Sequence, residues 1–212
     1  MPIQKRNYQK ELDAILAGLP QGSAVPRLLL HSCCAPCSSY VLEYLSQYFA
    51  ITVLYYNPNI SPQEEYELRK AEQQRLIGEG NWAHPVTFLD CDWDADAFDA
   101  IARGLENIPE GGVRCFACYR LRLAAAAEAA KKGGYDYFTT TLSISPLKNA
   151  QKLNEIGEEL AKKYGIAHLP ADFKKKEGYK RSILLSKEYN LYRQDYCGCV
   201  YSKQQRAESV TP

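Results

Sequence analysis

Three cysteines lie within five residues of one another in the segment HSCCAPC at positions 31–37, in a chain that has eight cysteines in all. Cys33 and Cys34 are neighbours, and they cannot easily pair with each other because a disulfide needs Cβ vectors that converge at about 3.8 Å. Their side chains can instead point to two different partners. Thiolates bind zinc and iron–sulfur clusters, so this spacing suggests metal or redox chemistry.

Four further cysteines form two close pairs, Cys115 with Cys118 and Cys197 with Cys199. The first pair is expected at the start of a helix, where a spacing of three places both sulfurs on one face and the helix N-terminus lowers thiol pKa values. A closed zinc site takes four ligands, so either three of the seven grouped thiols bind no metal, or the site holds more metal than one zinc ion. Neighbouring Cys33 and Cys34 could then serve different metal centres.

The elements that position these thiols follow from the spacing of apolar residues. Strands are expected at 28–30, 50–56, 86–89 and 137–141, and helices at 38–48, 61–77, 94–103, 115–132, 147–164 and 179–189. Strands that alternate with helices predict an α/β fold, a mostly parallel sheet with helices on both faces. Ligands bind beyond the carboxyl ends of such strands, so we expect a metal site at that edge of the sheet.

Composition places the chain among ordinary soluble proteins, with 212 residues, of which 46% are hydrophobic and 24% charged. We expect one α/β domain over residues 1–212, in which 1–25 form an N-terminal extension and 171–212 a basic part that holds the last cysteines. No apolar leader or membrane span is apparent, which predicts a cytoplasmic protein without a membrane partner. In a reducing compartment, eight cysteines favour metal binding over disulfides.

Five motifs resemble the epoxyqueuosine reductases of the QueH family. They are LLLHSCCAPC at 28–37, YYNPNISPQEEYELRK at 55–70, GGVRCFACYRLRL at 111–123, FTTTLSISPLK at 138–148 and YRQDYCGCVYS at 192–202. The resemblance spans about residues 27–202. It implies a fold like the adenine-nucleotide α-hydrolase (HUP) group, a [4Fe-4S] cluster and a second, mononuclear metal, iron or else zinc. The implied reaction reduces the epoxide of epoxyqueuosine in the tRNA anticodon loop to queuosine.

Carried over residue by residue, the resemblance assigns Cys34, Cys115, Cys118 and Cys197 to the cluster. It assigns Cys33, Cys37 and Cys199 to the second metal. Loss of an epoxide oxygen needs two electrons and a Lewis acid, which an adjacent cluster and an open metal site can supply. An external donor of the ferredoxin or flavodoxin type would reload the cluster. The candidates for proton delivery are Tyr196, Asp195 and His31.

The substrate-binding residues are expected among polar side chains at the strand ends and among basic residues near the C-terminus. The net charge of the whole chain is only +1, but residues 171–212 hold nine Lys and Arg against five Asp and Glu. Such side chains can contact phosphates, and tyrosines can stack on splayed bases. The candidates are Asn57, Asn59, Thr140, Ser143, Lys174, Lys175, Lys176 and Arg193.

Two other functions agree with a thiol-rich α/β chain. A cluster-dependent tRNA thiolation enzyme of the same fold group needs an ATP-binding loop of Ser-Gly-Gly-x-Asp-Ser type after the first strand, where this chain has HSCCAPCSS. That difference counts strongly against it. A zinc-stabilised RNA-binding module without catalysis would hold one closed zinc and be colourless, so iron, sulfide and zinc analysis separates it from the reductase.

Overall fold

Five parallel strands form a single sheet in the computed structural model, which describes residues 6–20, 22 and 24–210. In the sheet order β3-β2-β1-β4-β5 the strands are β3 (Val86–Leu89), β2 (Ala50–Leu54), β1 (Arg27–His31), β4 (Tyr137–Thr140) and β5 (Ala167–His168). The central strand β1 pairs with β2 on one side and with β4 on the other. The predicted parallel α/β fold is therefore confirmed.

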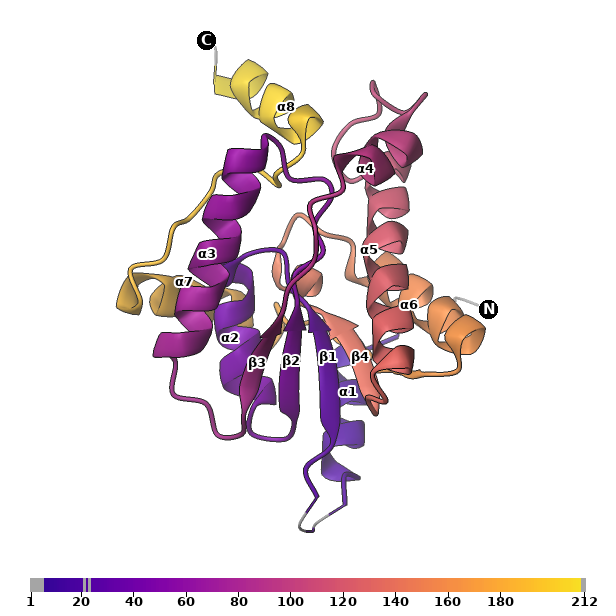
Figure 1. The fold of residues 1–212 in the computed structure, drawn as a ribbon, viewed down its shortest axis with the longest axis vertical. Coiled ribbons are helices and arrows are strands. Elements are labelled where there is room, and N and C mark those ends of the chain that lie inside the picture. Colours follow the sequence, from indigo (N-terminus) through magenta and orange to yellow (C-terminus); the bar gives the residue numbers. More distant parts are fainter. Residues whose placement is uncertain (1–5, 21, 23, 211–212) are drawn as a thin grey trace.

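Helices cover both faces of this sheet, as the alternating sequence pattern predicted (Figure 1). They are α1 (Tyr8–Ala17), α2 (Ala35–Leu45), α3 (Gln63–Glu79), α4 (Ala95–Ala102), α5 (Val113–Lys132), α6 (Ala150–Tyr164), α7 (Gly178–Glu188) and α8 (Val200–Val210), with a 3-10 turn, η1 (Thr141–Ile144), after β4. Leu28 and Leu30 of β1 pack in a core with residues of α1 and α2. Leu29 points to the other face, where it packs with residues of α5 and α6.

Three elements were not expected from the sequence. Helix α1 lies within the segment 1–25 that we expected to be an extension, and its Leu12 and Leu16 are buried in the same core as β1. Strand β5 has only two residues, too few for a periodic signal, and α8 is largely polar. Residues 1–5 and 21 and 23 of the expected extension, and 211–212 of the basic part, lie outside the described residues.

The sheet order determines where loops separate and leave room for a ligand. The chain leaves β1 toward β2 through α2, whereas β4 lies on the opposite side of β1, so the loops after β1 and β4 diverge at their carboxyl ends. Figure 1 shows the strand arrowheads pointing toward the end of the molecule where α4 and α8 lie. The thiol-rich segment after β1 begins at this divergence. None of the described helices is long and apolar enough to cross a membrane.

Candidate metal centre

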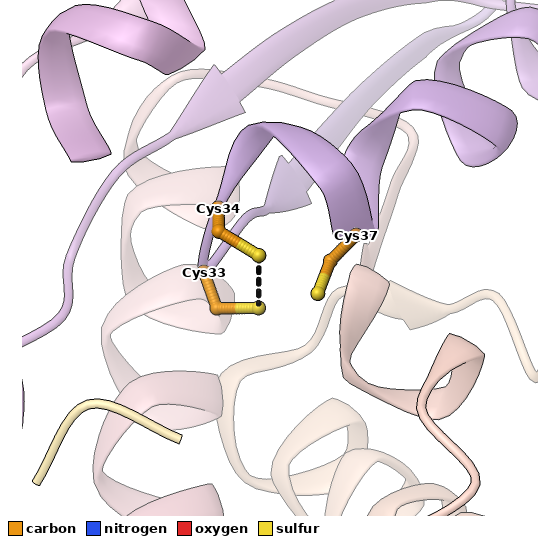
Figure 2. Close-up of side chains that lie close together, drawn as sticks. All are labelled: Cys33, Cys34 and Cys37. Carbon is orange, nitrogen blue, oxygen red and sulfur yellow. Dashed lines mark hydrogen bonds between the residues drawn. The ribbon is translucent and has the colours of Figure 1, made fainter. Parts of the chain in front are cut away.

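The three thiols after β1 converge. The Sγ atoms of Cys33, Cys34 and Cys37 all lie within 4.8 Å of one another, and Figure 2 shows Cys37 on the first turn of α2 facing the other two. Cys34 is the N-cap of α2, and Pro36 in the first turn favours the start of the helix there. This turn brings Cys37 back toward Cys33. The helix therefore begins three residues earlier than the sequence predicted.

Distances within this three-thiol group fit a single metal ion. The Sγ atoms of Cys33 and Cys34 are 3.8 Å apart. Zinc–sulfur bonds of about 2.3 Å in a tetrahedron place two ligand sulfurs about 3.8 Å apart. Three protein ligands leave a fourth tetrahedral position for a substrate atom, as in catalytic rather than structural metal sites. The Cys33 thiol has a pKa held well below its usual value by hydrogen bonds with the Cys34 and Cys37 thiols.

The other four grouped thiols line a small cavity beside the three-thiol group. Cys115 and Cys118 come from the first turns of α5, and Cys197 and Cys199 from the loop between α7 and α8. All eight cysteines of the chain lie within the described residues and are free thiols. The structure thus groups the seven thiols as three and four. It places Cys199 with the four, and Cys34 with the three.

Burial, not the helix N-terminus, dominates the pKa values of the α5 thiols. It raises the pKa of Cys118 to about 11 and also raises that of Cys115, although the backbone N–H of Gly111 donates to the Cys115 sulfur at 3.3 Å. The expected lowering by the helix N-terminus is therefore wrong for both. Metal binding at these thiols must release their protons, so the affinity for metal rises with pH.

Two buried cations lie where the two thiol groups adjoin. Arg122 and Lys148, together with Cys197, line both the four-thiol cavity and the larger cleft that reaches the three-thiol group. Lys148 donates to the Cys197 sulfur at 2.8 Å and to Glu110 at 3.1 Å. Burial disfavours the charge of Arg122, but the nearby Cys118 and Cys197 sulfur atoms hold its pKa above its usual value. These cations can offset the negative charge that the thiols acquire when they lose their protons to bind metal.

Three polar side chains of the four-thiol cavity have atoms without a hydrogen-bond partner among the described residues. They are the Tyr119 hydroxyl, Nη2 of Arg114 and Oδ1 of Asn59, and each residue is at most 2% exposed. An unpaired buried polar group costs about 1–3 kcal/mol, so native structures rarely keep three in one cavity. The lining therefore suits a polar guest rather than an apolar one, and its two free donors together with Arg122 and Lys148 favour a guest with negative charge.

The loop with Cys197 and Cys199 is fixed from the segment after β2. Arg69 of α3 is 1% exposed, donates to the Cys197 carbonyl at 3.2 Å and pairs with Glu65 at 2.7 Å. The backbone of Ser61 donates to the Gly198 carbonyl at 3.0 Å. Gly198 has φ +125°, and a Cβ there would come within 3.1 Å of Nη1 of Arg69, so glycine is needed between the two cysteines.

A cleft of about 500 Å³ opens over the three-thiol group, at the divergence of the loops after β1 and β4. Cys33 and Cys37 lie in its lining, and Arg193, Asp195 and Tyr196 line it from the segment before Cys197. Helix α8 lines the cleft with residues at positions i, i+3, i+4 and i+7, which are Ser202, Gln205, Arg206 and Ser209. The segment after η1 lines it with Ser145, Pro146, Leu147 and Lys148.

Several expected site residues do not line the cleft, because the fold uses their polar groups. His31 is fully buried; its Nδ1 lies 2.9 Å from the Thr140 hydroxyl and its Nε2 lies 3.1 Å from the Tyr56 carbonyl. Burial lowers the pKa of His31 to about 4, so the ring is neutral at physiological pH and serves to join the ends of β1 and β4. The Ser143 hydroxyl accepts from the backbone of Phe173.

The two asparagines after β2 also differ from the expectation. Asn57 donates to the Ser32 carbonyl at 2.7 Å and so supports the backbone just before Cys33. Asn59 lines the four-thiol cavity instead of the cleft. The lysines lie elsewhere: Lys174 pairs with Asp172 at 2.8 Å and Lys176 with Asp13 at 2.7 Å, while Lys175 is exposed. Of the basic residues proposed to bind substrate, only Arg193 lines the cleft.

Comparison with known proteins shows the family of this chain. The family model described as Epoxyqueuosine reductase QueH matches residues 28–205. The chain belongs to the epoxyqueuosine reductase QueH family. Epoxyqueuosine reductase QueH of Staphylococcus epidermidis is 43% identical over 206 residues, which cover 95% of this chain and 87% of that protein. The protein of the same name from Thermotoga maritima is 33% identical over 184 residues, 85% of this chain and 92% of its own length.

Membership in the QueH family confirms the resemblance carried by the five sequence motifs. The structure adds residues that the motifs contain but that sequence reasoning did not single out: Arg69, Arg114, Tyr119, Arg122 and Lys148. One signal was available for Arg122, because it lies four residues after Cys118 on a helix and therefore on the same face. The burial of Lys148 has no counterpart in the sequence pattern.

Proposed function

We propose that this chain reduces the epoxide of epoxyqueuosine in the anticodon loop of cytoplasmic tRNA to the cyclopentene of queuosine. The reaction consumes two electrons and two protons, breaks both C–O bonds of the epoxide, forms a C=C bond and releases water. The observation that supports the proposal is a three-thiol group open to a nucleoside-sized cleft, directly beside a four-thiol cavity. One site can hold the reacting atoms while the other supplies electrons.

The donor sets lead us to a partition of the seven thiols. We assign Cys33, Cys34 and Cys37 to the mononuclear metal, because their separation suits one ion and two of them line the cleft. We assign the four-thiol cavity, with its two cations and its unpaired polar atoms, to the [4Fe-4S] cluster. When bound, the cluster passes electrons singly and the mononuclear metal acts as a Lewis acid toward the epoxide.

The protein supplies position, charge and protons around these centres. Arg122 and Lys148 reach the cleft next to Cys33 and Cys197, where their charges favour negative charge that develops on a departing oxygen. Tyr196 and Asp195 lie in the cleft wall and remain the candidates for proton delivery. Electrons enter from an external one-electron carrier protein of the ferredoxin or flavodoxin type.

The cleft suits one nucleoside extruded from a tRNA loop. Its volume of about 500 Å³ falls within the usual range of about 300–1,000 Å³ for small-molecule sites. Tyr179 and Tyr196 lie in its walls and offer stacking surfaces, and Leu147, which is 71% exposed, stands at its rim. Recognition of RNA by splayed bases that stack on aromatic side chains is the usual mode for single-stranded loops.

A direct assay tests the proposal. Anaerobically purified protein, analysed for iron, sulfide and zinc, is incubated with epoxyqueuosine-containing tRNA and a reduced carrier protein, and the tRNA is digested to nucleosides for mass spectrometry. We expect queuosine, lighter than the starting nucleoside by one oxygen atom. Loaded protein that leaves epoxyqueuosine unchanged would refute the reductase assignment. Sulfur incorporation, or a colourless protein with one zinc, would favour the thiolation or the RNA-binding alternative.

The cleft geometry predicts which basic residues bind tRNA phosphates. Arg206 pairs with Asp195 at 3.7 Å on the surface, a contact weak enough to be exchanged for a phosphate, and Arg193 is exposed beside it. The double variant Arg193→Glu/Arg206→Glu should bind tRNA at least tenfold more weakly. Each lost phosphate contact lowers the magnitude of the slope of log K against log salt by about 0.7, so the loss of both should lower it by about 1.4. Filter binding at several salt concentrations measures both.

Lys175 provides the matched control, because it is an exposed basic residue that does not line the cleft. Lys175→Glu changes the net charge in the same direction. Equal effects of Lys175→Glu and of either arginine substitution would show that binding follows overall charge and not the cleft.

A further inference from the structure

The four-thiol cavity holds two hydrogen-bond donors that face no acceptor among the described residues. Tyr119 lines the cavity and is 1% exposed, and its buried hydroxyl has no partner among the described residues. It follows Cys118 directly on α5. Because its neighbours are buried apolar residues of the α5–α6 core, the ring is fixed and the hydroxyl cannot turn toward solvent.

Arg114 is also fixed by its contacts, and one nitrogen of its guanidinium makes no hydrogen bond among the described residues. Its Nη1 donates to the carbonyls of Leu105 and Glu106 at 2.9 and 2.7 Å, and its guanidinium lies over the ring of Tyr201 at 4.3 Å. Arg114 lines the cavity, and its buried Nη2 has no partner in the part of the chain that the structure describes. These contacts fix the plane of the guanidinium, so the free N–H groups have a set direction.

Two fixed, buried donors in one thiol-lined cavity point to sulfur acceptors that are present only when the site is loaded. Thiolate and sulfide sulfurs of an iron–sulfur cluster accept hydrogen bonds, and such bonds are one of the means by which a protein sets the cluster's potential. A donor stabilises the more negatively charged, reduced form more than the oxidised form. The donors therefore favour electron uptake.

We infer that the Tyr119 hydroxyl and Nη2 of Arg114 donate hydrogen bonds to sulfur atoms of the cluster held by the four thiols, and that they raise its reduction potential. The inference rests on the proposed function, since it needs a cluster in this cavity. Tyr119 and Arg114 are then positioning and tuning residues rather than catalytic ones. Their contribution is measured on the cluster itself, without substrate.

The test is a redox titration of the loaded enzyme, followed by the electron paramagnetic resonance signal of the reduced cluster. Tyr119→Phe removes the hydroxyl and keeps the ring, so we expect full iron and sulfide content with a lower midpoint potential. The equilibrium constant for one-electron reduction should fall by a factor of about three to ten, where tenfold corresponds to about 59 mV. Arg114→Lys keeps the charge but removes Nη2, and should lower the potential in the same direction.

Tyr55 supplies a matched control. Its hydroxyl is also buried and has no partner among the residues that the structure describes, but Tyr55 does not line the four-thiol cavity. Tyr55→Phe should leave the potential unchanged. The inference is overturned if Tyr119→Phe and Arg114→Lys both load fully and keep the wild-type potential, and the proposed function then stands. Wild-type protein without iron and sulfide would overturn both.

Discussion

Cys33→Ser protein is expected to keep the brown colour of its cluster and to lose turnover. Cys33 lines the cleft and belongs to the three-thiol group, while the cluster is assigned to four other thiols. Loss of a residue that merely supports a metal ligand typically costs 10–100-fold in affinity or activity, so loss of a ligand should cost at least about a hundredfold. Metal analysis should show loss of the second metal with iron and sulfide of the cluster retained.

Cys91→Ser is the control for this experiment, because Cys91 belongs neither to the three-thiol group nor to the thiols of the four-thiol cavity. Burial raises the pKa of Cys91 to about 11, so the side chain is a neutral thiol at physiological pH, and serine should be tolerated. Cys33→Ser protein as active as Cys91→Ser protein would reject a catalytic second metal at this site.

Four of the five strands were predictable from the sequence, because they are short apolar runs separated by helical segments. The strand predicted at 86–89 has the observed bounds. The edge of the sheet at which the site lies was also predictable, because Cys33 and Cys34 come directly after β1 and ligands bind at the carboxyl ends of parallel strands. Such patterns depend only on residues that are close together in the sequence.

The grouping of the thiols was not predictable in this way, because it depends on contacts between distant segments. Cys199 joins the α5 thiols because Arg69 and the backbone of Ser61, which follow β2, hold the Cys197–Cys199 loop. Charge counts along residues 171–212 also do not show which lysines are paired with acidic residues. Lys174 and Lys176 are matched to Asp172 and Asp13, and Asp13 lies more than 150 positions away in the chain.

The thiol grouping leads to the second large effect, a contrast between Cys199→Ala and Cys34→Ala. Cys199 is buried beside Cys118, and the Ser202 backbone N–H donates to its sulfur at 3.4 Å. Cys199→Ala protein should lose most of its iron, all of its sulfide and its colour, with activity reduced at least about a hundredfold. Cys34→Ala protein should keep cluster iron and sulfide and lose the second metal and the activity.

Thermal unfolding adds a readout that does not depend on turnover. Metal binding is coupled to folding, so loss of the cluster from the buried four-thiol cavity should lower stability by at least about 2 kcal/mol, or roughly 4–8 °C in a chain of this length. Cys34→Ala should change the melting temperature less, because the four-thiol cavity stays loaded. The reverse result, with colour lost in Cys34→Ala and kept in Cys199→Ala, would support the partition implied by the motifs alone. It would also show that the two loops rearrange when metal binds.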